Sequence, residues 1–202
     1  MNIRTFHLTP FVMNCYVVSE GETAIVIDPG EAAPELLAYL STLKVAMVVN
    51  THGHCDHCGG NAGVVAATGA PLAIHRADVP LLETLAQQGR MFGVPFPPSP
   101  APDLFLEAGQ SVGVGETQFE VRHAPGHSPG HVVLVTAGLA FVGDVLFEGS
   151  IGRTDLPGGD YGELIRSIHS QLLTLPDDTV VYSGHGPATT IGVERATNPF
   201  LV

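Results

Sequence analysis

The strongest constraint in this sequence is that four short apolar segments each stop just before histidine or aspartate. The segments are Val45–Asn50, Gln118–His123, Leu139–Gly143 and Thr179–Ser183. Their apolar residues and their Gly or Pro boundaries favour strands over helices. In a layered α/β fold, the ends of separate strands lie at one edge, where side chains from distant positions converge. The sequence therefore predicts one polar site built from several segments.

The residues that follow these segments are metal-ligand types. Val45–Asn50 runs directly into Thr51-His52-Gly53-His54-Cys55-Asp56-His57. Neutral imidazole and carboxylate groups bind zinc, iron and manganese, and a purely structural zinc site favours thiolates. The sequence thus predicts a catalytic metal site with the ligands His52, His54, Asp56, His57, His127, Asp144 and His185.

This ligand set is large enough for two divalent ions. An extended backbone puts His52 and His54 on the same side, so one ion can take both, and Asp56 continues that alternation. Because a third ligand from this stretch would crowd the first ion, we expect Asp56 and His57 to bind a second ion. We expect His127 to complete the first site, His185 the second, and Asp144 to bridge them. Two ions lower the pKa of a shared water and so supply hydroxide near neutral pH.

Composition excludes several other classes of protein. The chain has 8 basic against 20 acidic residues and a formal charge of −12, which disfavours binding to nucleic acid or to an anionic membrane. A hydrophobic content of 45% excludes bulk disorder. No apolar run suits a membrane span, Met1–Pro10 does not resemble a signal peptide, and three cysteines do not form a disulfide framework. We therefore expect a cytoplasmic enzyme.

The rest of the chain predicts a mixed α/β fold. Further strands are expected at Asn2–Leu8, Val12–Ser19, Ala24–Asp28, Leu72–His75 and His131–Thr136. Helices are expected at Glu31–Leu43, Asn61–Thr68, Ala77–Gly89 and Asp160–Leu175. The proline-rich stretch Val94–Pro102 cannot form regular structure. It is interpreted as a rigid surface loop, because too few residues lie on either side for two separate cores.

At the ligand residues, the chain resembles the metallo-β-lactamase superfamily. Thr51–His57 matches the signature THxHxDH, and His127, Asp144 and His185 stand at the remaining ligand positions. The resemblance covers essentially the whole chain and implies a single domain over residues 1–202. The implied fold is an α+β four-layer αββα sandwich, in which two mixed β-sheets carry helices on both outer faces. Asp56 and Asp144 are then the candidate catalytic carboxylates.

Within the superfamily, the chain is most similar to glyoxalase II (hydroxyacylglutathione hydrolase), particularly its short bacterial form. The matching stretches are Asp28–Gly30, Ala124–His131, Gly143–Phe147, Gly152–Asp155 and Ser183–Pro187. The resemblance implies that a metal-bridged hydroxide cleaves a small thioester such as S-lactoylglutathione. It implies two divalent ions, zinc first, with iron or manganese as alternatives. Arg153 stands where the family places a cation for the thiol carrier, and a structural loop arginine is the other interpretation.

Two questions stay open at this stage. Full-length glyoxalase II continues into a C-terminal helical domain that contacts glutathione, and we expect no such domain here, so another thiol carrier is an alternative. The second function considered is a mono-iron persulfide dioxygenase of the same superfamily, with iron on His52, His127 and Asp144. The presence of Asp56 and His185 favours the two-metal hydrolase. His131 is expected to lie next to the ligands and to orient them without binding the metal itself.

Overall fold

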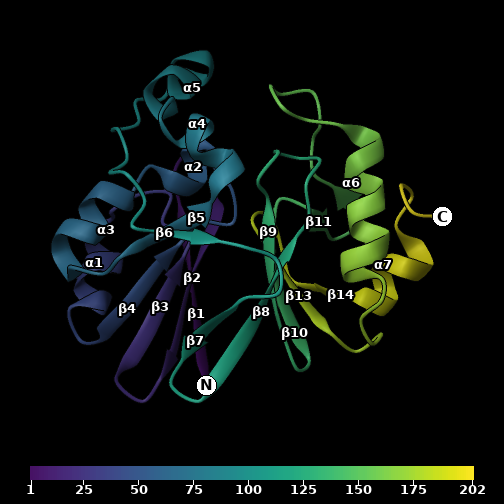
Figure 1. Cartoon of the computed structure of the whole chain (residues 1–202), viewed down its shortest axis with the longest axis horizontal. Coiled ribbons are helices and arrows are strands. Elements are labelled where there is room, and N and C mark those ends of the chain that lie inside the picture. Colours follow the sequence, from purple (N-terminus) through teal and green to yellow (C-terminus); the bar gives the residue numbers. More distant parts are fainter.

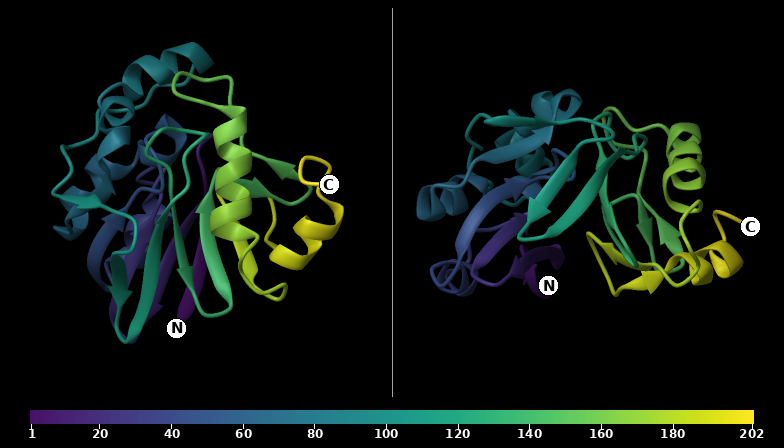
Figure 2. Two further views of the ribbon diagram at one scale, coloured as in Figure 1. Left: turned by 45° about the vertical axis from the view of Figure 1, so that its right-hand side comes forward. Right: turned by 60° about the horizontal axis from the view of Figure 1, so that its bottom comes forward.

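Two six-stranded mixed sheets face each other, and helices cover both outer faces (Figure 1). This arrangement is seen in the computed structural model, which describes residues 1–202. The layers are seen from other directions in Figure 2. The four-layer αββα sandwich implied by the sequence is therefore confirmed.

The first sheet has the strand order β1-β2-β3-β4-β5-β6. Strands β1 to β3 are antiparallel, whereas β3 to β6 are parallel. Parallel neighbours need crossover connections, which here carry helices. The strands are β1 Asn2–Leu8, β2 Met13–Glu20, β3 Thr23–Ile27, β4 Lys44–Val49, β5 Leu72–His75 and β6 Leu104–Leu106.

The second sheet has the order β14-β13-β10-β9-β8-β7. Because β9 is antiparallel to both β8 and β10, and β10 is parallel to β13, strands β8, β10 and β13 run in one direction. Their carboxyl ends therefore lie at the same edge. The strands are β7 Ser111–Val114, β8 Thr117–His123, β9 Val132–Thr136, β10 Leu139–Gly143, β13 Val180–Ser183 and β14 Thr189–Thr190, and β11 Leu146–Phe147 pairs with β12 Ser150–Ile151 as a separate hairpin.

Helices form the two outer layers, those before β6 on the first sheet and those after β12 on the second (Figure 1). None of them has the length and apolar character needed to cross a membrane. The first group is α1 Pro34–Leu40, α2 Cys55–Cys58, α3 Asn61–Thr68, α4 Val79–Leu82 and α5 Leu85–Phe92; the second is α6 Tyr161–Ser167, continued by a π-helical turn over Ile168–Leu172, and α7 Ile191–Thr197.

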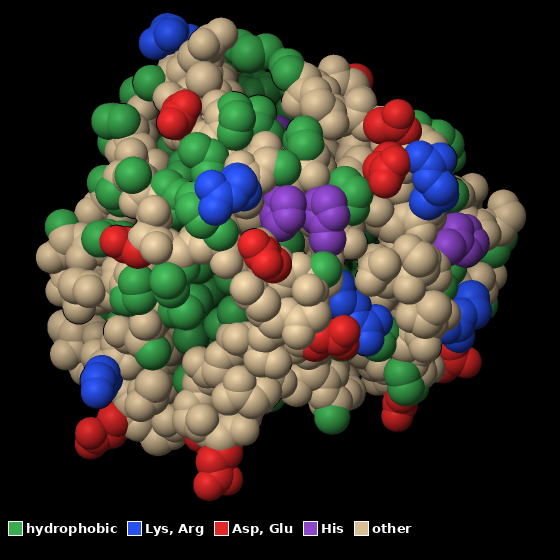
Figure 3. All heavy atoms as spheres, in the orientation of Figure 1, with side chains coloured by type: hydrophobic (Ala, Val, Ile, Leu, Met, Phe, Trp, Pro, Cys, Tyr) green, Lys and Arg blue, Asp and Glu red, His purple; other side chains and the backbone are tan.

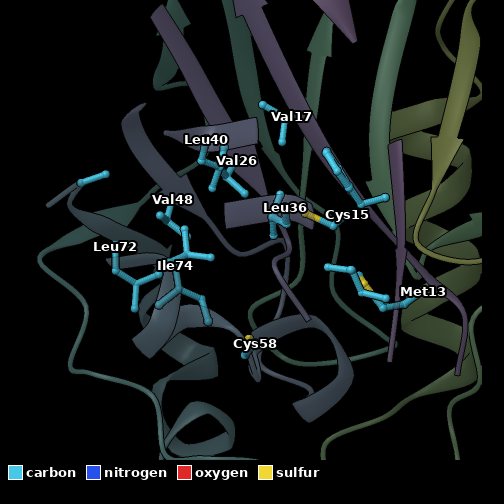
Figure 4. Packing of buried hydrophobic residues seen from close by; sticks show 14 of the residues in the cluster. Met13, Cys15, Val17, Val26, Leu36, Leu40, Val48, Cys58, Leu72 and Ile74 are labelled. Atoms are coloured by element: carbon cyan, nitrogen blue, oxygen red, sulfur yellow. The ribbon is translucent and has the colours of Figure 1, made fainter. Parts of the chain in front are cut away.

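The first sheet is buried on both faces. In β3, Val26 packs towards the helices with Leu36 and Leu40, as Figure 4 shows, whereas its neighbours Ile25 and Ile27 pack against the second sheet. Successive strand residues point to opposite faces, so a strand between two layers must be apolar throughout. This explains why β3 has a continuous apolar sequence and no alternation.

The nine predicted strands are confirmed, but three predicted helices differ in extent. The helix expected at Asp160–Leu175 is α6 continued by the π-helical turn, which ends at Leu172. The helix expected at Ala77–Gly89 is a 3₁₀ turn, Arg76–Asp78, followed by α4 and α5. Pro80 lies in the first turn of α4, where a helix tolerates proline. The Thr84 hydroxyl donates to the backbone carbonyl of Leu81 at the end of α4. The predicted helix is therefore divided into three short helices. Similarly, Pro34 sets the start of α1 later than predicted. The elements β6, β7, β11, β12, β14, α2 and α7 were not predicted.

Several hydrogen bonds join the two sheets beside the predicted site, and one of them comes from Tyr16. The Tyr16 hydroxyl in β2 donates to the carbonyl oxygen of Ser183, the last residue of β13, at 2.6 Å. Burial raises the pKa of Tyr16, so the hydroxyl remains a donor. We expect Tyr16→Phe to lower the free energy of unfolding by about 0.5–1.5 kcal/mol, measured by chemical denaturation.

The matched control is Tyr182→Phe. Tyr182 packs against Tyr16 with ring centroids 5.5 Å apart, but its hydroxyl makes no hydrogen bond within the chain. We expect a loss below about 0.5 kcal/mol for this variant. Equal losses in the two variants would contradict a stabilising role for the inter-sheet hydrogen bond.

Candidate metal centre

All the residues predicted to bind metal meet at the edge where β4, β8, β10 and β13 end. They come from five places in the chain. His52 and His54 lie in the turn after β4, Asp56 and His57 on α2, His127 between β8 and β9, Asp144 directly after β10, and His185 after β13.

These residues form two groups of three. In the first group, possible ligand atoms of His52, His54 and His127 all lie within 4.8 Å of one another. The closest contact joins His54 Nδ1 and His127 Nε2, at 2.9 Å. All three side chains are buried, so the group is shielded from bulk water.

The second group contains Asp56, His57 and His185, again within 4.8 Å of one another. His185 Nε2 lies 3.2 Å from Asp56 Oδ2, and His57 Nε2 lies 3.8 Å from the same oxygen. This is the division into two sets that the sequence predicted, with one carboxylate and two imidazoles in the second.

Asp144 lies between the two groups. Its Oδ2 is 3.6 Å from His127 Nε2 in the first group and 3.7 Å from His185 Nε2 in the second. Its Oδ1 is 3.3 Å from His57 Nε2. A single carboxylate with both groups in reach is the arrangement expected of a ligand shared between two ions.

The residues fit a pair of divalent ions because several buried polar atoms lack any partner in the chain. Three of the six such atoms belong to candidate ligands, namely His52 Nε2, His57 Nε2 and Asp144 Oδ1. Buried polar atoms nearly always have a hydrogen-bond partner, so each such atom needs an explanation. Nitrogen and oxygen atoms that point into two ligand groups are explained by cation binding.

In four of the histidines, Nδ1 lies within hydrogen-bond distance of an acceptor, which directs Nε2 towards the ligand groups. A proton on Nδ1 in each case fixes both the tautomer and the orientation of the ring. The Nδ1 partners are Thr51 Oγ1 for His52 (3.0 Å), Asp28 Oδ2 for His57 (3.0 Å), the Arg153 carbonyl for His127 (2.8 Å) and the Phe11 carbonyl for His185 (3.2 Å).

Asp28 organises two of these histidines. Its carboxylate accepts the Thr51 backbone N–H at 2.7 Å and the Thr51 hydroxyl at 2.6 Å, in addition to His57. The Thr51 hydroxyl can therefore accept from His52. Although Asp28 lies near His52 and His57, its oxygens already accept these three hydrogen bonds, so we assign it an orienting role. The sequence analysis noted Asp28 only as part of a matching stretch and missed this role.

Asp78 ties the two main ligand loops together. Its carboxylate is fully buried and accepts from the Gly53 N–H at 2.9 Å, the Ser128 hydroxyl at 2.6 Å and the Gly130 N–H at 2.5 Å. Gly53 lies between His52 and His54, and Ser128 follows His127. The sequence analysis missed this residue, because its partners lie 25 to 52 positions away.

His131 supports the bridging residue. Its Nε2 accepts the backbone N–H of Asp144 at 3.1 Å, and its ring stacks on His52 with centroids 4.7 Å apart. Burial lowers its pKa well below the usual range, so the ring is a neutral acceptor. This position agrees with the expectation that His131 orients the ligands without binding the metal itself.

One step of the sequence argument was wrong. An extended backbone was expected from His52 to Asp56, but α2 begins at Cys55, and His54 is the last extended residue before it. Asp56 therefore does not continue the alternation of His52 and His54. The short helix instead directs Asp56 and His57 towards the second group.

Burial keeps the first group neutral. It lowers the pKa of His52 well below its usual range and that of His54 to about 3. Burial raises the pKa of Asp144, but His57 outweighs this effect and holds it well below the usual range. Neutral imidazole and ionised carboxylate are the forms that bind metal.

Arg153, predicted to bind the substrate carrier, is already paired. Its Nε donates to Asp155 Oδ1 at 2.7 Å and its Nη2 donates to Asp155 Oδ2 at 2.8 Å. This pairing lowers the pKa of Asp155 to about 2. The backbone carbonyl of Arg153 holds His127, so the residue also has a structural role. Binding of a substrate by its side chain stays a prediction.

Comparison with known proteins agrees with this geometry. Residues 8–185 match the model of the metallo-β-lactamase superfamily. The chain belongs to this superfamily. It is 40% identical to hydroxyacylglutathione hydrolase GloC of Haemophilus influenzae over 208 residues, covering 100% of this chain and 98% of the relative.

Two crystal structures are similar over the whole chain. The BLEG-1 B3 metallo-β-lactamase has a TM-score of 0.92 and 38% identity, covering 100% of both chains. TTHA1623 in a di-iron-bound form has a TM-score of 0.90 and 42% identity, covering 98% of this chain and 100% of the other. Together with the GloC relative, the superfamily supports a metal-dependent hydrolase.

The role of Asp28 can be tested by Asp28→Asn. The amide would place an N–H against His57 or Thr51, so His57 would lose the acceptor that fixes its tautomer. Loss of such an orienting partner costs about 10- to 100-fold in metal affinity. Because Asp28 also orients His52 through the Thr51 hydroxyl, we expect that loss for both zinc ions, measured by competition with a chelator.

Asp103→Asn is the control, because Asp103 accepts a backbone N–H from Leu72 in β5, away from the ligands. Circular dichroism checks that both variants fold. Wild-type zinc affinity in folded Asp28→Asn would rule out the orienting role.

Proposed function

We propose that this chain is a binuclear metal-dependent hydrolase of small thioesters. The observation that carries the proposal is the position of Asp144 between two complete ligand groups. A single-metal enzyme has no need of a second set consisting of Asp56, His57 and His185.

A pair of divalent ions supplies a hydroxide nucleophile at neutral pH and polarises a carbonyl group. The chain itself contributes position and access. Asp56, Asp144 and His185 line a cavity of about 680 Å³ that opens to solvent, so a substrate can reach the ligand groups. Cys55 also lines it, but burial raises the pKa of its thiol to about 12, which rules it out as the nucleophile.

Thioesters are the substrates that best suit these residues. A thiolate leaves without protonation by a strong acid, and the carboxylates at the site are candidate ligands and therefore ionised. The similarity to a hydroxyacylglutathione hydrolase favours S-(2-hydroxyacyl)thiols, with S-lactoylglutathione as the first substrate to assay. Zinc is the first metal to test, and the di-iron form of a similar protein makes iron the second.

Hydrolysis of β-lactams is a second candidate, because BLEG-1 is similar over its whole length. An amide nitrogen is a poorer leaving group than a thiolate and needs a proton. Persulfide dioxygenation is the other alternative, and it would use only His52, His127 and Asp144. Parallel assays with S-lactoylglutathione, benzylpenicillin and glutathione persulfide separate the three.

His185→Ala tests the second group directly. We expect the zinc content to fall from about two to about one per chain. Thioester turnover should fall by at least about a hundredfold, since loss of one of two Lewis acids weakens both activation of water and charge stabilisation. Metal analysis and steady-state kinetics provide the two measurements.

His169→Ala is the control, because His169 is exposed on the π-helical turn. The assays are run under nitrogen and in air. Activity confined to aerobic, iron-loaded protein and kept in His185→Ala would replace the hydrolase with the dioxygenase.

A further inference from the structure

Resting on the proposed function, we propose that the outer wall of the cavity binds an apolar group of the thioester. The substrate class is then a thioester with an aliphatic or aromatic part, and a carrier with several charges is a poor substrate. The ions that the ligand groups would hold polarise the reacting carbonyl in any such thioester, so specificity depends on the wall.

Apolar side chains form most of this wall. They come from the β1–β2 turn, from α4 and α5, and from the segment after β10; the largest are Phe11, Leu81, Met91, Phe92, Phe147 and Leu156. Met91 is 63% exposed and Phe92 is 42% exposed. Figure 3 shows hydrophobic side chains gathered over this part of the molecule. Exposed apolar residues that line one cavity mark a binding site, unlike those scattered singly.

The apolar wall is continuous with the metal ligands. The Phe11 carbonyl accepts from His185 Nδ1, and the Phe11 ring lies edge-on to Phe92 with centroids 5.6 Å apart. On the other side, the Phe147 ring lies 6.3 Å from that of His185. A group attached to a thioester carbonyl at the ligands would therefore extend along these rings.

Charges at the cavity oppose a carrier with several carboxylates. Arg153 is the one Lys or Arg side chain that lines it, and Asp155 already takes two of its N–H groups. A substrate carboxylate would have to use the remaining N–H groups of Arg153, whose charge Asp155 already offsets. The formal charge of −12 adds a long-range repulsion for anionic ligands.

The main polar side chain of the wall is also engaged. Gln88 on α5 accepts the Cys55 N–H at 2.9 Å and donates to the Leu81 carbonyl at 2.8 Å and the Gly53 carbonyl at 3.2 Å. These bonds hold α5 against the ligand loop. Gln88 is therefore used to position the wall. Among the other polar residues that line the cavity, Gln87 is exposed and free to contact a ligand, whereas the largest side chains of the wall are apolar.

The first test varies the length of the apolar group and keeps the thioester bond the same. One set of thioesters keeps N-acetylcysteamine as a neutral thiol and lengthens the 2-hydroxyacyl chain. A second set keeps the lactoyl group and lengthens an alkanethiol. If the wall binds the group, kcat/KM rises about fourfold per methylene in one set until the wall is filled. The set that responds identifies whether the acyl or the thiol side occupies the wall.

Variants of two wall residues test where the apolar group binds. Met91→Ser and Phe92→Ser should flatten the dependence of kcat/KM on chain length, and Val193→Ser should keep the wild-type dependence. Val193→Ser is the matched control, because Val193 is 49% exposed on α7, outside the cavity. A flat dependence in the wild type, or S-lactoylglutathione preferred to every neutral thioester, would overturn the proposal.

A binding measurement separates this proposal from the proposed function. The fluorescence of N-phenyl-1-naphthylamine, a neutral apolar probe, is titrated with the wild-type protein and the three variants. We expect the Kd to rise at least about tenfold in Met91→Ser and Phe92→Ser and to stay constant in Val193→Ser. If no thioester is cleaved but this pattern holds, the hydrolase assignment fails and the apolar site stands. Equal Kd values in all four proteins would show that the wall is not an apolar site.

Discussion

The arrangement of the candidate metal ligands depends on the hydrogen bonds that the Asp28 carboxylate accepts. This carboxylate fixes His57 directly and His52 through the Thr51 hydroxyl, so two ligands in different groups share one orienting residue. Asp28 adopts φ +52°, a conformation that is unusual for a residue other than glycine. Such strain persists only where surrounding contacts hold it, and here its hydrogen bonds to Thr51 and His57 do so.

The two sheets explain why the ligands can meet at all. Strands β8, β10 and β13 end at one edge, and the first sheet brings the end of β4 to the same place. Asn14 in β2 joins the sheets there, since its side-chain amide donates to the carbonyls of Ser183 and Gly186 on either side of His185. The ligands thus depend on the register of both sheets.

The sequence could predict the candidate ligands because each follows an apolar segment, and strand ends converge for geometric reasons. It could not predict the partners that orient them. The bonds from Thr51 to Asp28 and from Ser128 to Asp78 span 23 and 50 positions, and nothing local marks either aspartate as buried. Sequence periodicity also cannot reveal α2, which has only four residues and so completes little more than one turn.

The cavity wall was unpredictable for a related reason. Met91 and Phe92 lie on α5, whose apolar residues suggest core packing, and only the three-dimensional arrangement shows them exposed beside the ligands. The break between α4 and α5 matters here. It lets α5 turn so that Gln88 holds the ligand loop while Met91 and Phe92 line the cavity.

Electrostatics completes the argument for cations at this edge. Asp28, Asp56 and Asp144 lie in a largely buried cluster in which burial keeps the imidazoles of His52 and His54 neutral, so those two rings do not balance the carboxylates. Burial lowers the pKa of His57, but Asp144 and Asp56 outweigh burial and raise it, so the carboxylates draw a positive charge to this point. Divalent ions provide that charge through the same nitrogen and oxygen atoms. An ion that binds only the folded chain stabilises the folded state by mass action. The histidines and carboxylates of the two ligand groups therefore couple metal binding to folding.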